Sequence, residues 1–234
     1  MRQIITLGGG GFSMEPNNLA LDKYILARSG KPRPNVCFVP TASGDSERYM
    51  LNFYRAFSTL NCNPRTLHLF PMPPTRNLEE FVLAQDVIYV GGGSVRNLVA
   101  LWREWKLDII FRKALDSGIL LCGISAGMNC WFEQCITDSI SPELDPFDCL
   151  GFLPGSACPH YDGEPLRKPR YRELIEQGAL KSGFAADDNC AIHWVDEKLY
   201  DIVASSPGAH AYECGMHDGV YKSTQLSARL LPRT

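Results

Sequence analysis

The stretch ILLCGISAG, residues 119–127, decides the fold and directs the search for function. It opens with an apolar run typical of a buried strand and continues into a G-x-S-x-G pattern centred on Ser125. In this pattern the central residue takes a strained conformation at a sharp turn from a strand into a helix, and the flanking glycines permit close backbone approach. We therefore expect a strand, a turn and a buried helix through residues 128–132, with the Ser125 hydroxyl held above the sheet.

Short apolar runs alternate with longer amphipathic ones through the first half of the chain. Buried strands are predicted at residues 3–7, 35–39, 66–69, 86–90 and 118–123. Helices are predicted between them, at residues 18–28, 46–60, 77–84, 94–105 and 107–117. This alternation predicts a doubly wound α/β fold, in which helices cover both faces of a mostly parallel sheet.

The second half of the chain is less regular. Residues 136–163 are punctuated by proline and glycine and are expected to lack regular structure. A helix is predicted at residues 167–177, followed by strands at residues 191–195, 198–202 and 209–214 that pair antiparallel at the far end of the sheet. No repeat or linker divides the sequence, so we expect one domain over residues 1–234.

Charge and composition exclude several classes of partner. The 234 residues include 23 Lys and Arg against 26 Asp and Glu, a net charge of −3, which gives no basis for binding nucleic acid or an anionic membrane. No run approaches the 18 or so apolar residues of a transmembrane helix. The nine cysteines form no C-x-x-C pair, and several lie in apolar runs. We expect a reduced, cytoplasmic protein without metal or cofactor.

A serine at such a turn is typical of a nucleophile in acyl transfer. The Ala126 N–H would lie at a helix N-terminus, where it can stabilise an oxyanion, and the glycine run 91–93 after a strand can supply a second N–H. Of the five histidines, His160 is the best candidate for the base because it follows Pro159 in an irregular segment. The others are expected to be structural or at the surface; they are His68, His193, His210 and His217.

Two adjacent acids are candidates to orient the imidazole. Asp187 and Asp188 both precede a predicted strand, and the residues alone do not choose between them. The resulting order of serine, histidine and acid differs from that of α/β-hydrolases, where the acid precedes the histidine.

Four motifs in one order resemble the peptidase E family of serine peptidases, whose relatives include cyanophycinase. They are GGG at 91–93, GISAG at 123–127, PHY at 159–161 and DDNCAI at 187–192. GGGGFS at 8–13 and PTA at 40–42 also resemble the bacterial peptidase E-like branch, and the likeness spans about residues 3–215. It implies a fold similar to class I glutamine amidotransferases and hydrolysis of dipeptides that begin with aspartate.

The resemblance also implies a role for each motif. Ser125 would be the nucleophile and His160 the base, with Gly92 and Ala126 as oxyanion donors. An ungapped match gives Asp188 as the acid, and a shift of one residue gives Asp187. A homodimer is compatible with such a fold.

Other positions bear on substrate preference. Ser94 and Val95 stand where many relatives have Asn-Thr, and Met128 stands where they commonly have a small residue. Asp138 resembles an aspartate that contacts a substrate amino group. An arginine at position 167, 170 or 172, with Arg170 the chosen candidate, can offer a guanidinium to a substrate carboxylate. β-Aspartyl peptides and other acyl compounds remain alternative substrates.

A non-catalytic, nucleotide-binding role is the competing hypothesis. It would use the glycines at 8–11 to hold phosphates at a helix N-terminus. The G-x-G-x-x-G pattern fails in either register, because Ser13 or Met14 stands at its last position.

Overall fold

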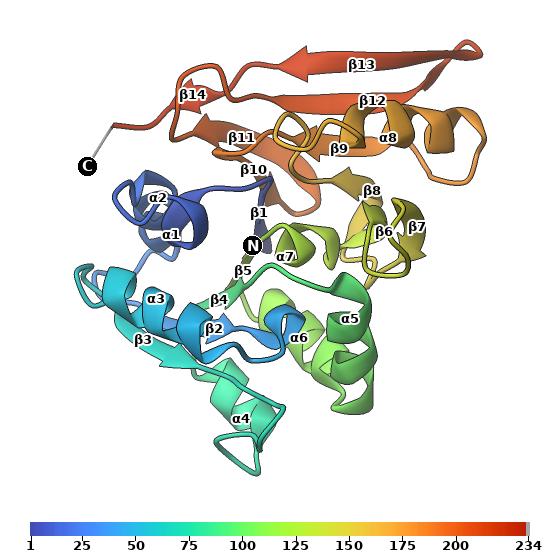
Figure 1. The fold of residues 1–234 in the computed structure, drawn as a ribbon. Helices are drawn as coiled ribbons and strands as arrows, with labels where there is room; N and C mark the ends of the chain where they lie inside the picture. Colours follow the sequence, from blue (N-terminus) through green and yellow to red (C-terminus); the bar gives the residue numbers. More distant parts are fainter. Residues whose placement is uncertain (233–234) are drawn as a thin grey trace.

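The computed structural model describes residues 1–232, and eight of its strands form one central sheet (Figure 1). Their order is β14-β11-β10-β1-β5-β4-β2-β3. Strands β1, β5, β4, β2 and β3 run parallel, whereas β10 pairs antiparallel with both β1 and β11. The bounds are β1 (Gln3–Leu7), β2 (Asn35–Val39), β3 (Asn63–Thr66), β4 (Val87–Val90), β5 (Leu120–Ile124), β10 (Cys190–Val195), β11 (Lys198–Ala204) and β14 (Arg229–Leu230).

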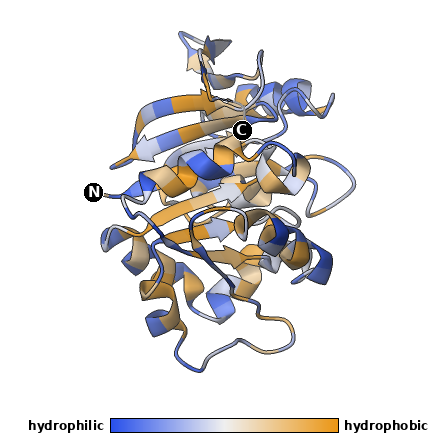
Figure 2. Cartoon of the chain, turned by 90° about the vertical axis from the view of Figure 1, so that its left-hand side faces the viewer, coloured by the Kyte–Doolittle hydropathy of each residue, from blue (hydrophilic) through white to orange (hydrophobic). Residues whose placement is uncertain are grey.

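Helices cover both faces of this sheet, which confirms the doubly wound α/β fold. Buried side chains of α1 (Gly11–Met14), α2 (Ala20–Arg28) and α3 (Glu47–Phe57) pack on one face. Those of α4 (Leu78–Leu83), α5 (Val95–Glu104), α6 (Leu107–Asp116) and α7 (Ala126–Asn129) pack on the other. The strands in the middle of the molecule are coloured mostly as hydrophobic, whereas hydrophilic residues gather on helices, loops and the outer strands (Figure 2). A short 3₁₀ helix, η1 (Thr41–Ser43), follows β2.

Polar side chains fix where several helices begin. Ser46, Asn77 and Ser94 precede α3, α4 and α5, and each accepts a hydrogen bond from a backbone N–H in the first turn. Such caps satisfy donors that the helix itself leaves free. Among residues 1–232, no helix has the length and apolar character required to cross a membrane.

A second sheet of six strands lies beside α8 (Arg167–Glu176), from the top to the right-hand side of Figure 1. Its order is β13-β12-β9-β8-β6-β7. The bounds are β6 (Phe132–Thr137), β7 (Asp145–Asp148), β8 (Leu153–Cys158), β9 (Gly183–Ala186), β12 (Ala211–His217) and β13 (Val220–Leu226). Buried residues of α8, β8, β9 and β12 form a small core of their own.

This second sheet overturns three predictions. The helix expected through residues 128–132 ends at Asn129, and the chain enters β6 at Phe132. The segment 136–163 is not irregular, because it contains β7 and β8. The strand expected at 209–214 is β12, which belongs to the second sheet instead of the end of the first. These strands carry proline, glycine and half-exposed polar residues, so they lack the continuous apolar run of a strand buried on both faces.

The third strand was also placed too late. Residues 66–69 were expected to pair, but β3 pairs with β2 through residues 63–66. Leu67 and Leu69 give this segment its apolar pattern because both side chains are buried in the core. They follow Thr66, the last residue of β3, so they are not part of the strand. Pro64 is tolerated because β3 is an edge strand.

Candidate active site

Ser125 stands at the sharp turn between β5 and α7. Its backbone has φ 58° and ψ −113°, a positive φ that is uncommon for a residue with a side chain. Gly123 and Gly127 make the turn possible, because a Cβ on Gly123 would overlap the Gly127 carbonyl and one on Gly127 would overlap the Val90 carbonyl. The Ser125 side chain is therefore fixed by its backbone at the carboxyl edge of the sheet, where it stays partly exposed.

The end of β1 brings Ser125 and His160 to the same place. The Ser125 N–H donates to the Leu7 carbonyl at 3.1 Å, and the His160 N–H donates to the next carbonyl, that of Gly8, at 3.3 Å. Successive Cα atoms are about 3.8 Å apart, so the two residues are anchored to neighbouring points of one strand end. His160 also has a positive φ, 51°, which shows that its backbone is held in an unusual conformation.

The His160 ring is paired with Asp188. Its Nδ1 lies 2.6 Å from Asp188 Oδ1, and the two side chains are 14% and 23% exposed. The Asp188 N–H donates to Asp162 Oδ1 at 2.8 Å, which fixes the turn that carries the carboxylate. Because Nδ1 is engaged by the carboxylate, Nε2 is the ring nitrogen left to exchange a proton with another group.

The neighbouring carboxylate of Asp187 has a different environment. Its Oδ2 accepts hydrogen bonds from the His210 N–H at 3.0 Å and from the Tyr212 hydroxyl at 3.2 Å. The side chain is buried, and burial raises its pKa. Asp187 thus ties the turn to β12, whereas Asp188 meets the imidazole.

The glycine run that follows β1 makes room for this acid-bearing turn. A Cβ on Gly9 would overlap the Asp188 carboxylate, and one on Gly10 would overlap the Asn189 side chain. Gly10 has a φ of 95°, which disfavours other residues at that position. Close packing against the acid-bearing turn therefore gives a structural reason for glycine at these positions.

The two expected oxyanion donors, the N–H groups of Ala126 and Gly92, differ in whether they already donate a hydrogen bond. No hydrogen bond within residues 1–232 uses the Ala126 N–H, which lies at the start of α7 beside Ser125. The Gly92 N–H donates to the Tyr49 hydroxyl at 3.2 Å. A Cβ on Gly92 would lie 3.3 Å from Ser125 Cβ and 3.7 Å from its Oγ, so Gly92 is adjacent to the serine even though its N–H has a partner.

Ser94 and Asp138, the expected substrate contacts, lie at the start of α5 and at the end of β6. The Ser94 hydroxyl accepts the Asn97 N–H at 3.2 Å and so caps α5. Asp138 is exposed, and the Ser139 hydroxyl next to it accepts the Val95 N–H at 3.1 Å. The turn after β6 is thus docked on the helix that follows the glycine run 91–93. Met128 is fully buried.

The arginines of α8 are already engaged. The buried Arg167 donates to the Ile136 carbonyl at 3.2 Å and pairs with Glu164 at 2.7 Å. Arg170 donates to the Leu144 carbonyl at 3.0 Å and pairs with Glu173 at 2.8 Å. Arg172 pairs with Glu176. The contacts with the Ile136 and Leu144 carbonyls hold α8 against neighbouring segments, whereas the Arg170–Glu173 and Arg172–Glu176 pairs lie within the helix.

Of the other histidines, His193 has a clear structural role. It is buried in β10, with Nδ1 at 2.9 Å from the Tyr24 hydroxyl and Nε2 at 3.1 Å from Gln3 Oε1. Burial lowers its pKa to about 4. It therefore remains neutral near pH 7 and acts as a core hydrogen-bonding residue.

Two residues near the site were missed from the sequence, Tyr49 and Asp162. Tyr49 lies on α3, 43 positions before the glycine whose N–H it accepts, and no local pattern links them. Asp162 lies within the segment expected to be irregular, and its closeness to His160 in the sequence was the only sign of a link with the site.

Among residues 1–232, no group of three or more His, Cys, Asp or Glu side chains is placed to hold a metal ion, and all nine cysteine side chains are buried.

Comparison with known proteins places this geometry among peptidases. The chain matches the family model of peptidase family S51 over residues 4–202. It is 55% identical over 231 residues to the uncharacterized peptidase YgaJ of Bacillus subtilis, covering 99% of this chain and 100% of that protein. It is 26% identical over 223 residues to peptidase E of Pasteurella multocida, covering 91% and 87% of the two chains.

Two solved structures share the fold. A peptidase from an acI-B1 actinobacterium superposes with a TM-score of 0.70 at 16% identity, covering 97% of this chain and 95% of that one. A putative peptidase E of Listeria monocytogenes superposes with a TM-score of 0.64 at 18% identity, covering 88% and 100%. These likenesses agree with the expected fold, similar to class I glutamine amidotransferases.

Proposed function

The chain belongs to peptidase family S51, and from this premise we propose that it is a serine-type dipeptidase that removes an N-terminal aspartate from short peptides. Ser125 is the nucleophile, His160 the base and Asp188 the acid that orients the ring. The observation that carries this proposal is the 2.6 Å contact of His160 Nδ1 with Asp188 Oδ1, together with the anchoring of Ser125 and His160 to successive carbonyls of residues 7 and 8.

The proposed reaction proceeds through an acyl-enzyme. His160 Nε2 takes the proton of the Ser125 hydroxyl as the oxygen attacks the peptide carbonyl, and the imidazolium is stabilised by Asp188. The tetrahedral oxyanion is held by the Ala126 N–H and by a second donor beside Gly92. His160 then protonates the leaving amine, and a water molecule activated by the same imidazole releases the acid product.

Selection of a free N-terminus requires a group that binds an ammonium ion. We assign this role to Asp138, because its carboxylate is exposed on the turn that contacts α5 at Val95. In support of this role, α5 begins at Val95, one residue beyond Ser94 and the glycine run 91–93 that carries the proposed oxyanion site.

The test compares Ser125→Ala with Ser117→Ala, which changes an exposed serine at the end of α6. Both are assayed on Asp-X dipeptides, β-Asp-X dipeptides and an acyl ester. Removing a triad serine typically lowers kcat by about 10⁶, so Ser125→Ala is expected to lose turnover while Ser117→Ala keeps it.

The assay also separates the alternatives. Faster turnover of β-Asp-X than of Asp-X would replace the proposed substrate by the β-aspartyl class. Wild-type rates in Ser125→Ala on every substrate would refute the serine mechanism.

A further inference from the structure

We infer that the Tyr49 hydroxyl is the second oxyanion donor, in the place that the sequence assigns to the Gly92 N–H. The inference rests on the proposed function, because it names a further catalytic residue for the same reaction. It concerns a side chain from α3, an element that the sequence does not connect with the active site.

The first observation is that the Gly92 N–H already has a partner. It donates to the Tyr49 hydroxyl at 3.2 Å, so it is directed toward the α3 side of the sheet. A backbone N–H has one proton, and one that is engaged elsewhere binds an oxyanion only by giving up or sharing that contact. A donor at the position of Gly92 can then come from the group that engages its N–H, the Tyr49 hydroxyl.

The second observation is that both hydroxyls lie close to Gly92. Its N–H contacts Tyr49, while a Cβ built on the same residue would lie 3.7 Å from Ser125 Oγ. Tyr49 and Ser125 thus share one neighbouring glycine. Gly91 is packed in the same way, since a Cβ there would lie 2.9 Å from Tyr49 Cε1.

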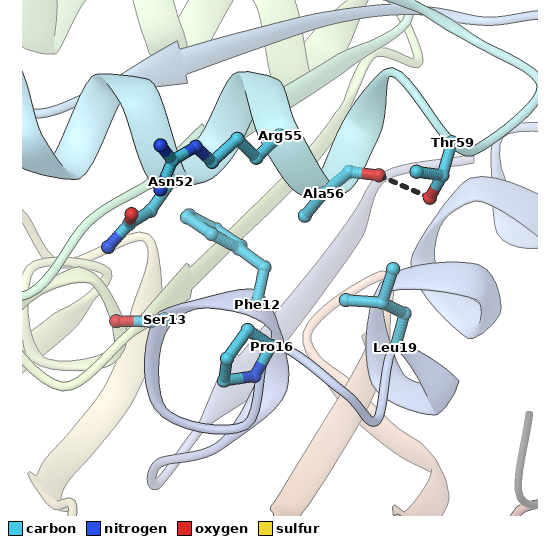
Figure 3. A pocket seen from close by; sticks show the side chains of 8 residues that line it. All are labelled: Phe12, Ser13, Pro16, Leu19, Asn52, Arg55, Ala56 and Thr59. Atoms are coloured by element: carbon cyan, nitrogen blue, oxygen red, sulfur yellow. Dashed lines mark hydrogen bonds between the residues drawn. The ribbon is translucent and has the colours of Figure 1, made fainter.

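The third observation is that Tyr49 is held in place. Its ring packs at 4.9 Å from the Phe38 ring and at 5.7 Å from the Phe12 ring, between centroids. Its hydroxyl lies 2.7 Å from Ser13 Oγ. Ser13 borders a cavity of about 280 Å³ between α1 and α3 (Figure 3). A side chain fixed in this way is preorganised, which is the property that makes an oxyanion donor effective.

The hydrogen-bonding capacity of a phenol fits this role. A tyrosine oxygen can accept two hydrogen bonds and donate one. When the Gly92 N–H and the Ser13 hydroxyl both donate to it, its own proton is free for the substrate oxygen. Burial raises the pKa of Tyr49, so the phenol keeps that proton at neutral pH. No bond to the tyrosine forms or breaks, and the proton stays on its oxygen throughout.

The test is Tyr49→Phe, which keeps the ring and removes only the hydroxyl. Loss of one oxyanion donor is expected to lower kcat on an Asp-X dipeptide by about 10²–10³ and to leave KM within a few-fold. An aminoboronic acid analogue of aspartate, which becomes tetrahedral on the serine, is expected to bind more weakly by a similar factor. Tyr54→Phe is the matched control, because Tyr54 lies on the same helix and its hydroxyl lies 3.3 Å from Thr66 Oγ1.

Ser13→Ala supplies a second measurement that leaves Tyr49 intact. It removes one hydrogen bond to the phenol, so kcat is expected to fall about 5-fold. A kcat of Tyr49→Phe equal to or higher than that of the wild type would overturn the inference. It would show that the hydroxyl only occupies the Gly92 N–H and keeps it from the substrate. Failure of the underlying function is distinct, because Ser125→Ala would then retain the wild-type rate.

Discussion

The glycine run after β1 touches two carboxylates whose surroundings are opposite. At Gly9 it meets Asp188, which is partly exposed and paired with the His160 imidazole. At Gly11 it meets Asp22, which is fully buried and accepts the Phe12 N–H at 2.9 Å. Burial raises the pKa of Asp22 to about 7.

The difference lets one loop contact both a carboxylate of the proposed triad and a carboxyl group of the core. A carboxylate that stabilises an imidazolium must lie within hydrogen-bonding distance of the ring nitrogen, and Asp188 does. A carboxyl group that anchors a loop needs only a donor, and Asp22 accepts the Phe12 N–H, in the first turn of α1, within an aromatic core. Three changes test whether the two groups are separated in this way.

The largest expected effect is the loss of kcat when Asp188, the carboxylate paired with His160, is changed. Asp188→Asn is expected to lower kcat by about 10⁴, because an amide neither fixes the imidazole tautomer nor stabilises its charge. Asp187→Asn is expected to stay within about 10-fold, because its contacts are to His210 and Tyr212. Steady-state rates of the two variants on one Asp-X dipeptide test which aspartate acts as the acid. A larger loss in Asp187→Asn would reverse the assignment of the acid.

A smaller effect is expected from the loop itself. In Gly9→Ala, the new methyl group would overlap the Asp188 carboxylate and displace it from His160. A shift of about 1 Å in a catalytic group can cost roughly 100-fold in rate, so we expect a loss of that order in kcat. Thermal unfolding of the variant serves as the control. An unchanged rate in a folded protein would show that the close approach is not needed for catalysis.

The inner carboxyl group is expected to affect stability and its pH dependence. The folded-state pKa of Asp22, about 7, lies above the unfolded value of 3.8, so the unfolded state binds fewer protons between these values. The free energy of unfolding should therefore decrease as pH rises from about 4 to 7, by roughly 2 kcal/mol between pH 5 and pH 7.

Asp22→Asn is expected to remove this decrease, because the amide does not titrate. Urea unfolding at pH 5 and pH 7 measures it, with Asp116→Asn, at an exposed site on α6, as the control. If the stability of Asp22→Asn depends on pH as strongly as that of the wild type, the assignment of a stabilising role to Asp22 is contradicted.

Several features were predictable because they depend on neighbours in the sequence. Strands β1, β2, β4 and β5 are buried on both faces, and this requires the continuous apolar runs that the sequence displays. The turn at Ser125 was predictable for a similar reason, since Gly123 and Gly127 are needed by local backbone geometry.

The second sheet was not predictable in this way. β7 and β8 contain proline, glycine and acidic residues, and their burial comes from partners far along the chain, such as β9 for β8. Periodicity reports how a segment is buried on average, so a short strand with one half-exposed face gives little signal.

The sequence by itself determined the parallel core, the strained turn and the set of candidate groups, because backbone sterics and burial act through adjacent residues. Only the tertiary structure decided that Asp188 and not Asp187 meets His160, and that Tyr49 takes the Gly92 N–H. Adjacent residues in extended backbone point their side chains in opposite directions. Which of them meets a given group therefore depends on how the segments pack in three dimensions. Distances across the fold, and not spacing along the chain, therefore select among chemically equivalent residues.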